Sequence, residues 1–387
     1  MPRMRVGVAG CGDVAQHTYL PGLARLTRDG CLDLAAVADP VAGRAAEMAQ
    51  RHGVPRAYPS VEDLLGADVD LVVNLTPMPV HAQVTLSALA AGKHVYTEKP
   101  IATRLEDADA IIDAAARAGV TVAAAPALLV HPDIRQSQQW LDAGVIGKIC
   151  FARARASNPG PDRIPDFLTD PTWFHKAGAG PLYDLGVYPL HVLTGALGPV
   201  RRVTAFSGVA IPRRVVAHGP ARGRAIDVEV DDNTHLLLDF GDAAFAYVDA
   251  TYCVLSSKGP RIEFYGETGV MNLASTPDEP PIEVYRTDAG SGLRGSTTPE
   301  PVYRGRVNPP RRRPDPPPYT LVSGVEHLVE HLERGTPLLL TAAHARHVLE
   351  ITLAVQRSAR EGRVVDLRTT FERPRREAPR TGTDGPP

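Results

Sequence analysis

The first 125 residues alternate short apolar runs with longer alanine-rich stretches. Short continuous apolar runs are typical of buried strands, and apolar residues at helical spacing are typical of helices. The pattern predicts strands at residues 5–9, 32–38, 71–75, 94–96 and 120–123, and helices at residues 41–52, 80–91 and 105–118. Gly53, Gly92 and Gly119 follow these helices, where a left-handed C-terminal cap favours glycine. Strands that alternate with helices predict a doubly wound α/β domain with a parallel sheet.

After about residue 126 the pattern becomes that of an α+β domain. It predicts a helix at 132–143, a loop rich in proline and glycine at 158–171, a helix that starts near residue 178, strands at 200–209, 233–240, 243–252, 261–265, 270–273 and 282–285, and two closing helices within 321–359. We therefore expect a first domain at 1–126, a second at 127–370 and a disordered tail at 371–387.

Composition adds two oddities to an ordinary globular profile of 43% hydrophobic and 22% charged residues. Only five of the 42 basic residues are lysines, so a lysine in a motif is conspicuous. Eight of the 36 prolines fall in residues 299–318, together with several arginines. This stretch is either a basic flap over an anionic part of a substrate or a solvated surface loop, and runs of charge usually face water.

Charge and cysteine content narrow the class of protein. A net charge of −2 provides no broad positive field, which argues against nucleic acid or an anionic membrane as the main partner and favours small polar ligands. The four cysteines form no CxxC pair, so neither a disulfide framework nor a structural zinc site is indicated. No apolar run approaches the ~18 residues of a membrane span, and the N-terminus has no signal-peptide pattern. These features predict a cytoplasmic protein.

A dinucleotide-binding motif follows the first predicted strand. The segment reads Gly10-Cys-Gly12-Asp13-Val14-Ala15, which matches GxGxxA at the required strand-to-helix turn. The next predicted strand ends in Asp39, where a carboxylate can bind the adenosine ribose hydroxyls. Asp39 favours NAD, and the nearby Arg44 leaves NADP as the alternative. A helix-capping role of Asp39 before Pro40 is compatible with both.

Two further segments follow predicted strands at the edge where open α/β sheets bind ligands. One contains Thr76, Pro77 and His81, and the other reads Glu98-Lys99-Pro100. A lysine at this edge can lower the pKa of a substrate hydroxyl or relay its proton while hydride leaves the carbon. The alternative is an ordinary surface lysine.

Four segments together resemble the Gfo/Idh/MocA oxidoreductase family. They are GxGxxA, Thr-Pro-x-x-x-His, residues 90–100 (AAGKHVYTEKP) and residues 178–188 (GAGPLYDLGVY). The resemblance implies an N-terminal Rossmann domain that binds NAD or NADP, followed by a domain with a large, open, mostly antiparallel sheet. It also implies a homodimer or homotetramer formed through that sheet.

The resemblance further implies a set of site residues. Family members use the lysine of Glu-Lys-Pro with the Asp and His of Asp-x-Gly-x-His, which match Lys99, Asp184 and Tyr188. Tyrosine in place of histidine is a departure, and a phenol beside an ammonium is a workable acid–base pair. His191, one helical turn after Tyr188, either binds substrate or acts as the base. In the plain alternative, Tyr188 and His191 only pack between domains.

Three weaker candidates remain. Lys176 and Trp173 precede the glycine-rich segment and are candidate substrate contacts, with surface and core roles as their alternatives. The run from His327 to His331 spells HxxEH, a zinc pattern in one class of proteases. It lacks a third ligand and a protease context, so a solvated helical face and no metal are favoured.

These features predict an enzyme that moves hydride between NAD(P) and a secondary alcohol or ketone. The substrate would be a sugar, a cyclitol or a sugar conjugate such as a nucleotide sugar or an aminoglycoside. Two alternatives stay open: an NAD-dependent glycosidase that works through a transient ketone, and a non-catalytic sensor of dinucleotides.

Overall fold

A computed structural model describes residues 3–165, 169–274, 280–286, 303–305 and 321–373. The chain divides into two compact units, each described here by itself. The N-terminal unit comprises Met1–His131 and Asp315–Leu349, and the C-terminal unit comprises Pro132–Pro314 and Glu350–Pro387. The described residues 321–349 thus pack with the first unit, although their position in the sequence places them beyond the expected border at residue 126. A single domain border in the sequence cannot describe a unit that is made of two separate stretches of the chain.

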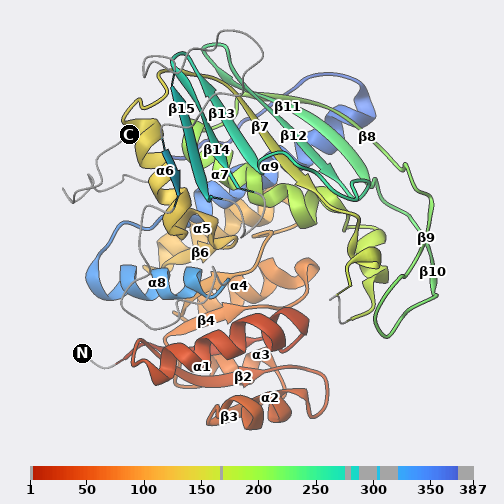
Figure 1. Cartoon of the computed structure of the whole chain (residues 1–387). Coiled ribbons are helices and arrows are strands. Elements are labelled where there is room, and N and C mark those ends of the chain that lie inside the picture. Colours follow the sequence, from red (N-terminus) through yellow and green to blue (C-terminus); the bar gives the residue numbers. More distant parts are fainter. Residues whose placement is uncertain (1–2, 166–168, 275–279, 287–302, 306–320, 374–387) are drawn as a thin grey trace. The chain divides into compact units, whose positions relative to one another are not determined.

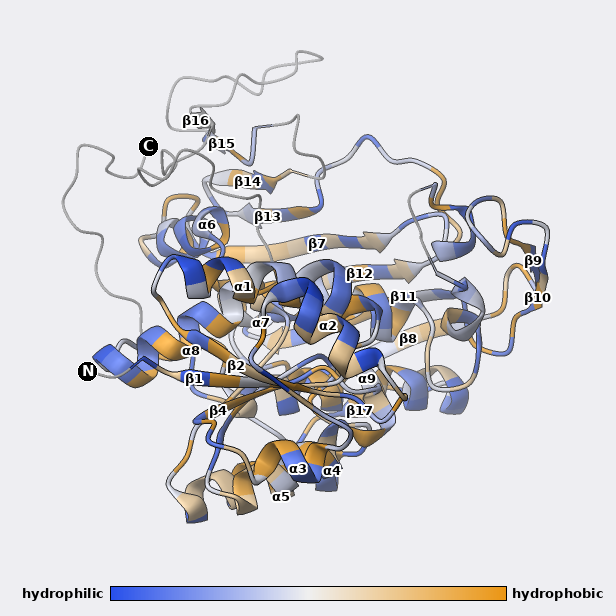
Figure 2. Cartoon of the chain, turned by 90° about the horizontal axis from the view of Figure 1, so that it is seen from below, coloured by the Kyte–Doolittle hydropathy of each residue, from blue (hydrophilic) through white to orange (hydrophobic). Residues whose placement is uncertain are grey.

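The N-terminal unit is built on a parallel sheet of six strands in the order β3-β2-β1-β4-β5-β6 (Figure 1). The strands are β1 (Arg5–Ala9), β2 (Asp33–Ala38), β3 (Arg56–Tyr58), β4 (Leu71–Asn74), β5 (His94–Thr97) and β6 (Val122–Ala124). The predicted doubly wound sheet is confirmed, and only the short, mostly exposed edge strand β3 was not predicted. The strands β1 and β4 are hydrophobic along most of their length (Figure 2), as expected for strands buried on both faces.

Helices follow most strands of this unit, as the apolar spacing predicts. They are η1 (Ala15–Tyr19), α1 (Leu20–Arg28), α2 (Arg44–His52), α3 (Val61–Leu65), α4 (His81–Ala90), α5 (Leu105–Ala118) and, after the return of the chain, α8 (Ser323–Arg334). The three glycines predicted as left-handed caps have positive φ values of +65° to +71°. On α8, Gly324 approaches Tyr96 so closely that a Cβ would lie 2.3 Å from the phenol oxygen, so glycine lets this helix pack against the unit.

The C-terminal unit contains a mixed, mostly antiparallel sheet in the order β16-β15-β14-β13-β7-β12-β11-β8-β17. Its strands are β7 (Ile149–Ser157), β8 (Arg202–Gly208), β11 (Asn233–Gly241), β12 (Ala244–Thr251), β13 (Ile262–Gly266), β14 (Gly269–Leu273), β15 (Ile282–Arg286), β16 (Tyr303–Gly305) and β17 (Val365–Asp366). A separate hairpin pairs β9 (Arg213–Val215) with β10 (Ala225–Asp227). The predicted fold class, a large open sheet after the parallel domain, is confirmed.

Strand β7 lies in the middle of this sheet and was missed in the sequence. It runs parallel to β12 and antiparallel to β13. Its inward residues are Ala152, Ala154 and Ala156, all buried, while arginines alternate with them. Alanine has low strand preference, so the alternation carries little strand signal by itself.

Helices cover one face of the large sheet. They are α6 (Pro132–Asp142), α7 (Val187–Leu197) and the C-terminal part of α9 (Ala342–Glu361), with short turns η4 (Pro161–Arg163), η5 (Pro171–His175) and η6 (Leu182–Gly186) before α7. The opposite face carries exposed apolar side chains, among them Phe206 at 85% exposure, Leu237 and Phe245. The register places all three on one face, because Phe206 pairs with His235 and Leu237 with Tyr247.

Two expectations fall mainly on undescribed residues. Nearly all of the proline- and arginine-rich stretch 299–318 and most of the tail 371–387 lie outside the described residues. Within the tail's first residues, Phe371 is buried and Arg373 pairs with Asp142 at 2.5 Å. The ordered chain therefore extends at least to residue 373. Among the described residues, no helix has the length and apolar character of a membrane span.

Candidate active site

The glycine-rich loop after β1 is shaped by two glycines with different tasks. Gly10 has a φ of +94°, and a Cβ there would lie 2.7 Å from the carbonyl oxygen of Leu75. A Cβ on Gly12 would meet no atom within 4 Å. Gly10 is therefore required by the fold, whereas Gly12 borders open space at the start of a helix, where a dinucleotide phosphate fits.

Asp39 closes this loop from the end of β2. It is 4% exposed, and its Oδ2 accepts a hydrogen bond of 2.8 Å from the backbone N–H of Cys11. Its Oδ1 accepts one of 2.8 Å from the N–H of Val41, and Nη1 of Arg44 lies 3.3 Å from Oδ2. A carboxylate oxygen can accept two hydrogen bonds, so Oδ1 of Asp39, which has one described donor, retains capacity for a ribose hydroxyl. Arg44 is the group that a 2′-phosphate would meet.

The thiol between the two glycines is chemically quiet. Cys11 is fully buried, and burial, followed by the negative charge of Asp39, raises the pKa of its thiol to about 12. A thiol with so high a pKa keeps its proton and does not act as a nucleophile. Cys11 therefore serves the loop through its backbone N–H.

His81 joins the two other predicted segments of the N-terminal unit. It is the first residue of α4 and is almost fully buried. One ring nitrogen, Nε2, lies 2.7 Å from the carbonyl oxygen of Thr76, and the other, Nδ1, lies 2.8 Å from that of Pro100. The described contacts of His81 are thus with the chain itself, and they connect the loop after β4 with the loop that carries Lys99.

Glu98 has a comparable linking position. It is buried, and its Oε1 accepts a hydrogen bond of 2.6 Å from the phenol of Tyr19, in the helix that follows the glycine-rich loop. Burial and the neighbouring Glu98 raise the pKa of Tyr19, so this phenol stays a donor. The Oε2 of Glu98 accepts from the backbone N–H of Lys99 at 2.9 Å. Half-buried Lys99 therefore lies in a loop that Glu98 anchors to the helix after the glycine-rich loop.

The remaining predicted residues of this unit lie around the same edge. Ala15 is fully buried, which allows close helix packing, while Asp13 is exposed and pairs with His17 at 3.1 Å. Val14 stands half-buried between them, and Pro77 follows Thr76 in an extended conformation. The hydroxyl of Thr76 donates to the Oδ1 of Asn74 at 2.6 Å. Asn74 was missed, although an amide at the end of an otherwise apolar buried strand is a signal.

The candidate residues of the C-terminal unit lie on the helix that begins with η6. Asp184 lies in the π-helical turn Leu182–Gly186, and half-buried Tyr188 follows one turn later in α7. His191 is 4% exposed, and its Nδ1 lies 2.8 Å from the carbonyl oxygen of Val187. A Cβ on Gly186 would lie 3.4 Å from that of Ala250 in β12, an ordinary van der Waals distance. The turn that carries Asp184 therefore packs directly on the sheet.

Lys176 and Trp173 lie on a neighbouring segment, in and after η5. The ammonium of Lys176 is 2.6 Å from the carboxylate of Glu229 and donates to the carbonyl oxygen of Asp227 at 3.1 Å. Trp173 is 52% exposed and stacks near Phe174, with ring centroids 4.0 Å apart. The core alternative for Trp173 is therefore wrong, and its indole is accessible.

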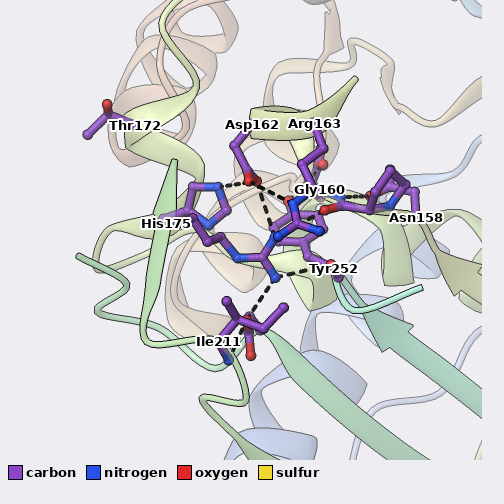
Figure 3. A network of polar contacts seen from close by, with 12 residues as sticks. Asn158, Gly160, Asp162, Arg163, Thr172, His175, Ile211 and Tyr252 are labelled. Carbon is purple, nitrogen blue, oxygen red and sulfur yellow. Dashed lines mark hydrogen bonds and ion pairs between the residues drawn. The ribbon is translucent and has the colours of Figure 1, made fainter. Parts of the chain in front are cut away.

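A buried polar cluster that includes His175 of η5 was not predicted from the sequence (Figure 3). Its centre is Arg214, which is 1% exposed and contacts Asp162 at 3.2 Å and Asp232 at 2.9 Å. His175 lies 3.1 Å from Asp162, and both are fully buried. The sequence offers no signal for this cluster, since Arg214 stands in a proline- and arginine-containing stretch that looks like a loop.

The HxxEH stretch has structural contacts of its own. Nε2 of His327 accepts from the backbone N–H of Leu339 at 2.9 Å, and Nδ1 of His331 lies 2.5 Å from the carbonyl oxygen of Thr336. Both side chains therefore bind the turn after α8, so the expected solvated face is in fact half-buried. In the described part of the chain, no group of three or more His, Cys, Asp or Glu side chains is placed to hold a metal ion.

Comparison with known proteins places both halves of the chain. Residues 4–125 match the family model described as an oxidoreductase family with an NAD-binding Rossmann fold, and residues 134–272 match the GFO/IDH/MocA C-terminal domain. A solved NAD-binding oxidoreductase from Klebsiella pneumoniae has the same fold, with a TM-score of 0.78 over 94% of this chain and 99% of that one at 24% identity.

Similar sequences carry named activities. The chain is 31% identical to dTDP-3,4-didehydro-2,6-dideoxy-alpha-D-glucose 3-reductase of Actinomadura kijaniata over 293 residues, 74% of this chain and 80% of the relative. It is 32% identical to inositol 2-dehydrogenase 3 of Saccharopolyspora erythraea over 239 residues, 59% of this chain and 66% of the relative. With an NAD-binding domain at its N-terminus and this reductase as a relative, the chain belongs to the GFO/IDH/MocA family of oxidoreductases.

Proposed function

We propose that this enzyme transfers hydride between NAD and a secondary alcohol or ketone of a sugar, a cyclitol or a sugar conjugate. The observation that carries the proposal is the cradle of the N-terminal unit. Gly12 opens onto free space, Asp39 faces the same loop, and His81 and Glu98 anchor the loop of Lys99 at the same edge of the sheet. Relatives of this chain are named sugar and cyclitol dehydrogenases and reductases, which supports the substrate class and disfavours a glycosidase or a sensor.

Different residues of the chain are assigned to proton transfer, to substrate orientation and to substrate contact. When bound, the nicotinamide supplies the hydride acceptor or donor. Lys99 and Tyr188 hold and move the proton of the reacting hydroxyl, and Asp184 orients the substrate. His191 is the alternative base, and the exposed indole of Trp173 offers an apolar wall for a sugar ring. Lys176 contacts the substrate only when its ion pair with Glu229 is broken.

Cofactor contacts are assigned to the first unit. Gly10, Gly12, Asp13, Val14 and Ala15 form the phosphate end, and Asp39 holds the ribose. Thr76 and Pro77 line the nicotinamide end, while His81 and Glu98 act by holding the loops. The position of Arg44 beside Asp39 keeps NADP as the alternative cofactor.

The assembly is proposed to be a homodimer or homotetramer formed through the open face of the large sheet. Its support is the row of Phe206, Leu237 and Phe245 on that face. Large exposed apolar side chains gathered on one face are typical of protein interfaces. All four cysteines are free thiols, the state that a reducing compartment such as the cytoplasm maintains.

A spectroscopic screen tests the proposed reaction. The purified protein is mixed with NAD+ or NADP+ and with myo-inositol, levoglucosan, D-xylose, nucleotide sugars or aminoglycosides, and absorbance near 340 nm is followed. Only net redox chemistry changes the nicotinamide chromophore, so a rise is expected for at least one substrate. No signal with any substrate and either cofactor would overturn the proposal.

Lys99→Met tests the role of the lysine. Loss of a general acid or base costs about 10²–10⁴-fold, so kcat should fall at least about 100-fold while NADH still binds. Lys93→Met is the matched control, because Lys93 precedes β5 and donates to the carbonyl oxygen of Val69 at 2.9 Å, at the opposite end of the strand from Lys99. Unchanged turnover in Lys99→Met would remove Lys99 from the chemistry.

A further inference from the structure

A tyrosine at the end of β12 reaches the candidate catalytic aspartate. Tyr252 follows β12 directly and is 1% exposed, and its hydroxyl donates to the Oδ2 of Asp184 at 2.9 Å. Burial, followed by the charge of Asp184, raises the pKa of Tyr252 far above its ordinary value. The phenol therefore keeps its proton at working pH and acts only as a donor to the carboxylate.

The position of Tyr252 is held on every side. Its backbone N–H donates to the carbonyl oxygen of Asp232 at 2.8 Å, and its own carbonyl oxygen accepts from Nη2 of Arg214 at 3.0 Å. Its ring meets His175 edge-on, with centroids 5.6 Å apart and planes at 68°. These contacts restrain both the backbone and the ring of Tyr252.

Arg214 fixes this arrangement from the β9–β10 hairpin (Figure 3). Its Nη1 donates to the carbonyl oxygen of Pro159 at 3.0 Å and contacts Asp162, while its Nη2 binds both Asp232 and Tyr252. Hydrogen bonds between buried charged groups are strong because no water competes for the donors and acceptors, and they therefore hold their partners in place. One guanidinium thus joins the hairpin, the loop before η4 and the end of β12.

The backbone around Asp184 departs from regular α-helical geometry. Asp184 lies in the π-helical turn Leu182–Gly186, where the regular ladder of the helix is interrupted. The turn rests on β12 through Gly186 and Ala250, and Tyr252 lies two residues beyond Ala250. The same strand therefore seats the backbone of the turn and orients its carboxylate.

We propose that Tyr252 is a positioning residue which, held by Arg214, sets the orientation of the Asp184 carboxylate for its work on the substrate. The inference rests on the proposed function, because it assigns Asp184 the role of orienting the substrate. It adds a residue outside all four motifs and makes the Arg214 cluster part of the support of the active site.

Tyr252→Phe tests the hydrogen bond alone, since the ring and its packing remain. A hydrogen bond to a charged group contributes about 1.5–3 kcal/mol, equivalent to about 10- to 100-fold in rate, so kcat should fall by at least about tenfold. The KM for NAD+ should change less than about twofold, because cofactor binding is assigned to the other unit. Tyr183→Phe is the matched control: it removes a partly buried phenol next to Asp184 that donates to Gln356 at 3.0 Å.

A double-mutant cycle separates positioning from a general structural role. In an Asp184→Ala background, Tyr252→Phe should lower kcat by less than about twofold, because the acceptor of its hydrogen bond is gone. A drop equal to that in the wild-type background, or wild-type kcat in Tyr252→Phe, would overturn the inference. A fully active Asp184→Asn would instead remove Asp184 from the proposed mechanism.

The same cycle measured by urea unfolding needs no substrate. The unfolding free energies of the two single variants and the double variant should be non-additive, because Tyr252 and Asp184 are in contact. Additive effects would contradict the bond itself. A wild-type enzyme that turns over none of the screened substrates would count against the proposed function, while this measurement would still decide the contact.

Discussion

Neighbouring residues of the glycine-rich loop differ in backbone conformation and in the space around them. Gly10 adopts a φ of +94° against the backbone of Leu75, whereas Gly12 borders open space. Cys11, between them, offers only its backbone N–H because its thiol is buried and protonated. The motif therefore combines a position that the fold requires, Gly10, with one that is proposed to face the cofactor, Gly12, and substitution can separate the two.

Gly12→Ala should leave the fold intact and weaken the cofactor site. A Cβ at this position meets nothing within 4 Å, so the free energy of unfolding should change by less than about 1 kcal/mol. The methyl group would occupy space assigned to the pyrophosphate, so the Kd for NADH, measured by fluorescence titration, should rise at least about tenfold.

Gly10→Ala is the contrasting variant. Its Cβ would lie 2.7 Å from a backbone oxygen and its φ is strained for alanine, so it should lower the unfolding midpoint. Unchanged NADH binding in Gly12→Ala would contradict the assignment of the loop to the cofactor.

At the scale of elements, the C-terminal unit is joined by buried charge as well as by sheet pairing. Arg214 of β9 contacts Asp162 of η4 and Asp232 before β11, and His175 of η5 contacts the same Asp162. Removing one partner from a buried pair leaves the other charge without compensation. The hairpin and the two short turns should therefore lose stability together.

The cluster predicts a response to acid. Burial alone would raise the pKa of Asp162, but His175 and Arg214 outweigh it and hold that pKa below the ordinary value of 3.8. A carboxyl with a lowered folded-state pKa contributes stability above its unfolded-state pKa and loses it as the pH falls through the folded-state value. The urea midpoint should thus decline as the pH falls below about 3.8.

Asp162→Asn should flatten this acid response and cost about 3–5 kcal/mol at pH 7, because Arg214 loses a buried partner. Asp242→Asn provides the control, since Asp242 is exposed and its φ of +51° suits asparagine. An acid slope in Asp162→Asn equal to that of the wild type would contradict the role of this carboxylate.

At the scale of the whole molecule, the open face of the large sheet is the surface to test. Phe206, Leu237 and Phe245 are exposed on it, although strand alternation would normally place polar residues on a solvated face. Covering such side chains is favourable, because the burial of apolar surface lowers the free energy by about 25 cal/mol per Å². A second copy of the chain is the proposed cover.

Phe206→Glu with Leu237→Glu should reduce the assembly to a smaller species in light scattering coupled to size exclusion. Two charges per chain would be buried in the interface, at a cost larger than the apolar contacts they replace. Leu255→Glu is the control, because Leu255 is 72% exposed in the connection between β12 and β13, outside the sheet face. A wild-type monomer, or an unchanged mass in the double variant, would contradict the proposed interface.

Much of the N-terminal unit follows from the sequence. Most of its strands are apolar on both faces, helices such as α5 are amphipathic, and the predicted cap glycines are left-handed, so local pattern and final structure agree. The GxGxxA turn, Asp39 and the Lys99 loop could be assigned for the same reason, since each follows a recognisable strand. Even the departure at Tyr188 was visible as a difference within a motif.

The remaining features depend on residues that are distant in the sequence. Strand β7 is held in the sheet by β12 and β13 rather than by its own alanine-rich pattern, and residues 321–349 return to the first unit. The Tyr252–Asp184 bond and the Arg214 cluster join side chains 13 (His175 to Asp162) to 68 residues apart. Sequence by itself therefore determined the units built from local periodicity and the motifs attached to their strands. Only the tertiary structure decided the polar contacts around Asp184, because a buried side chain gains its partners from long-range packing, and periodicity carries no record of them.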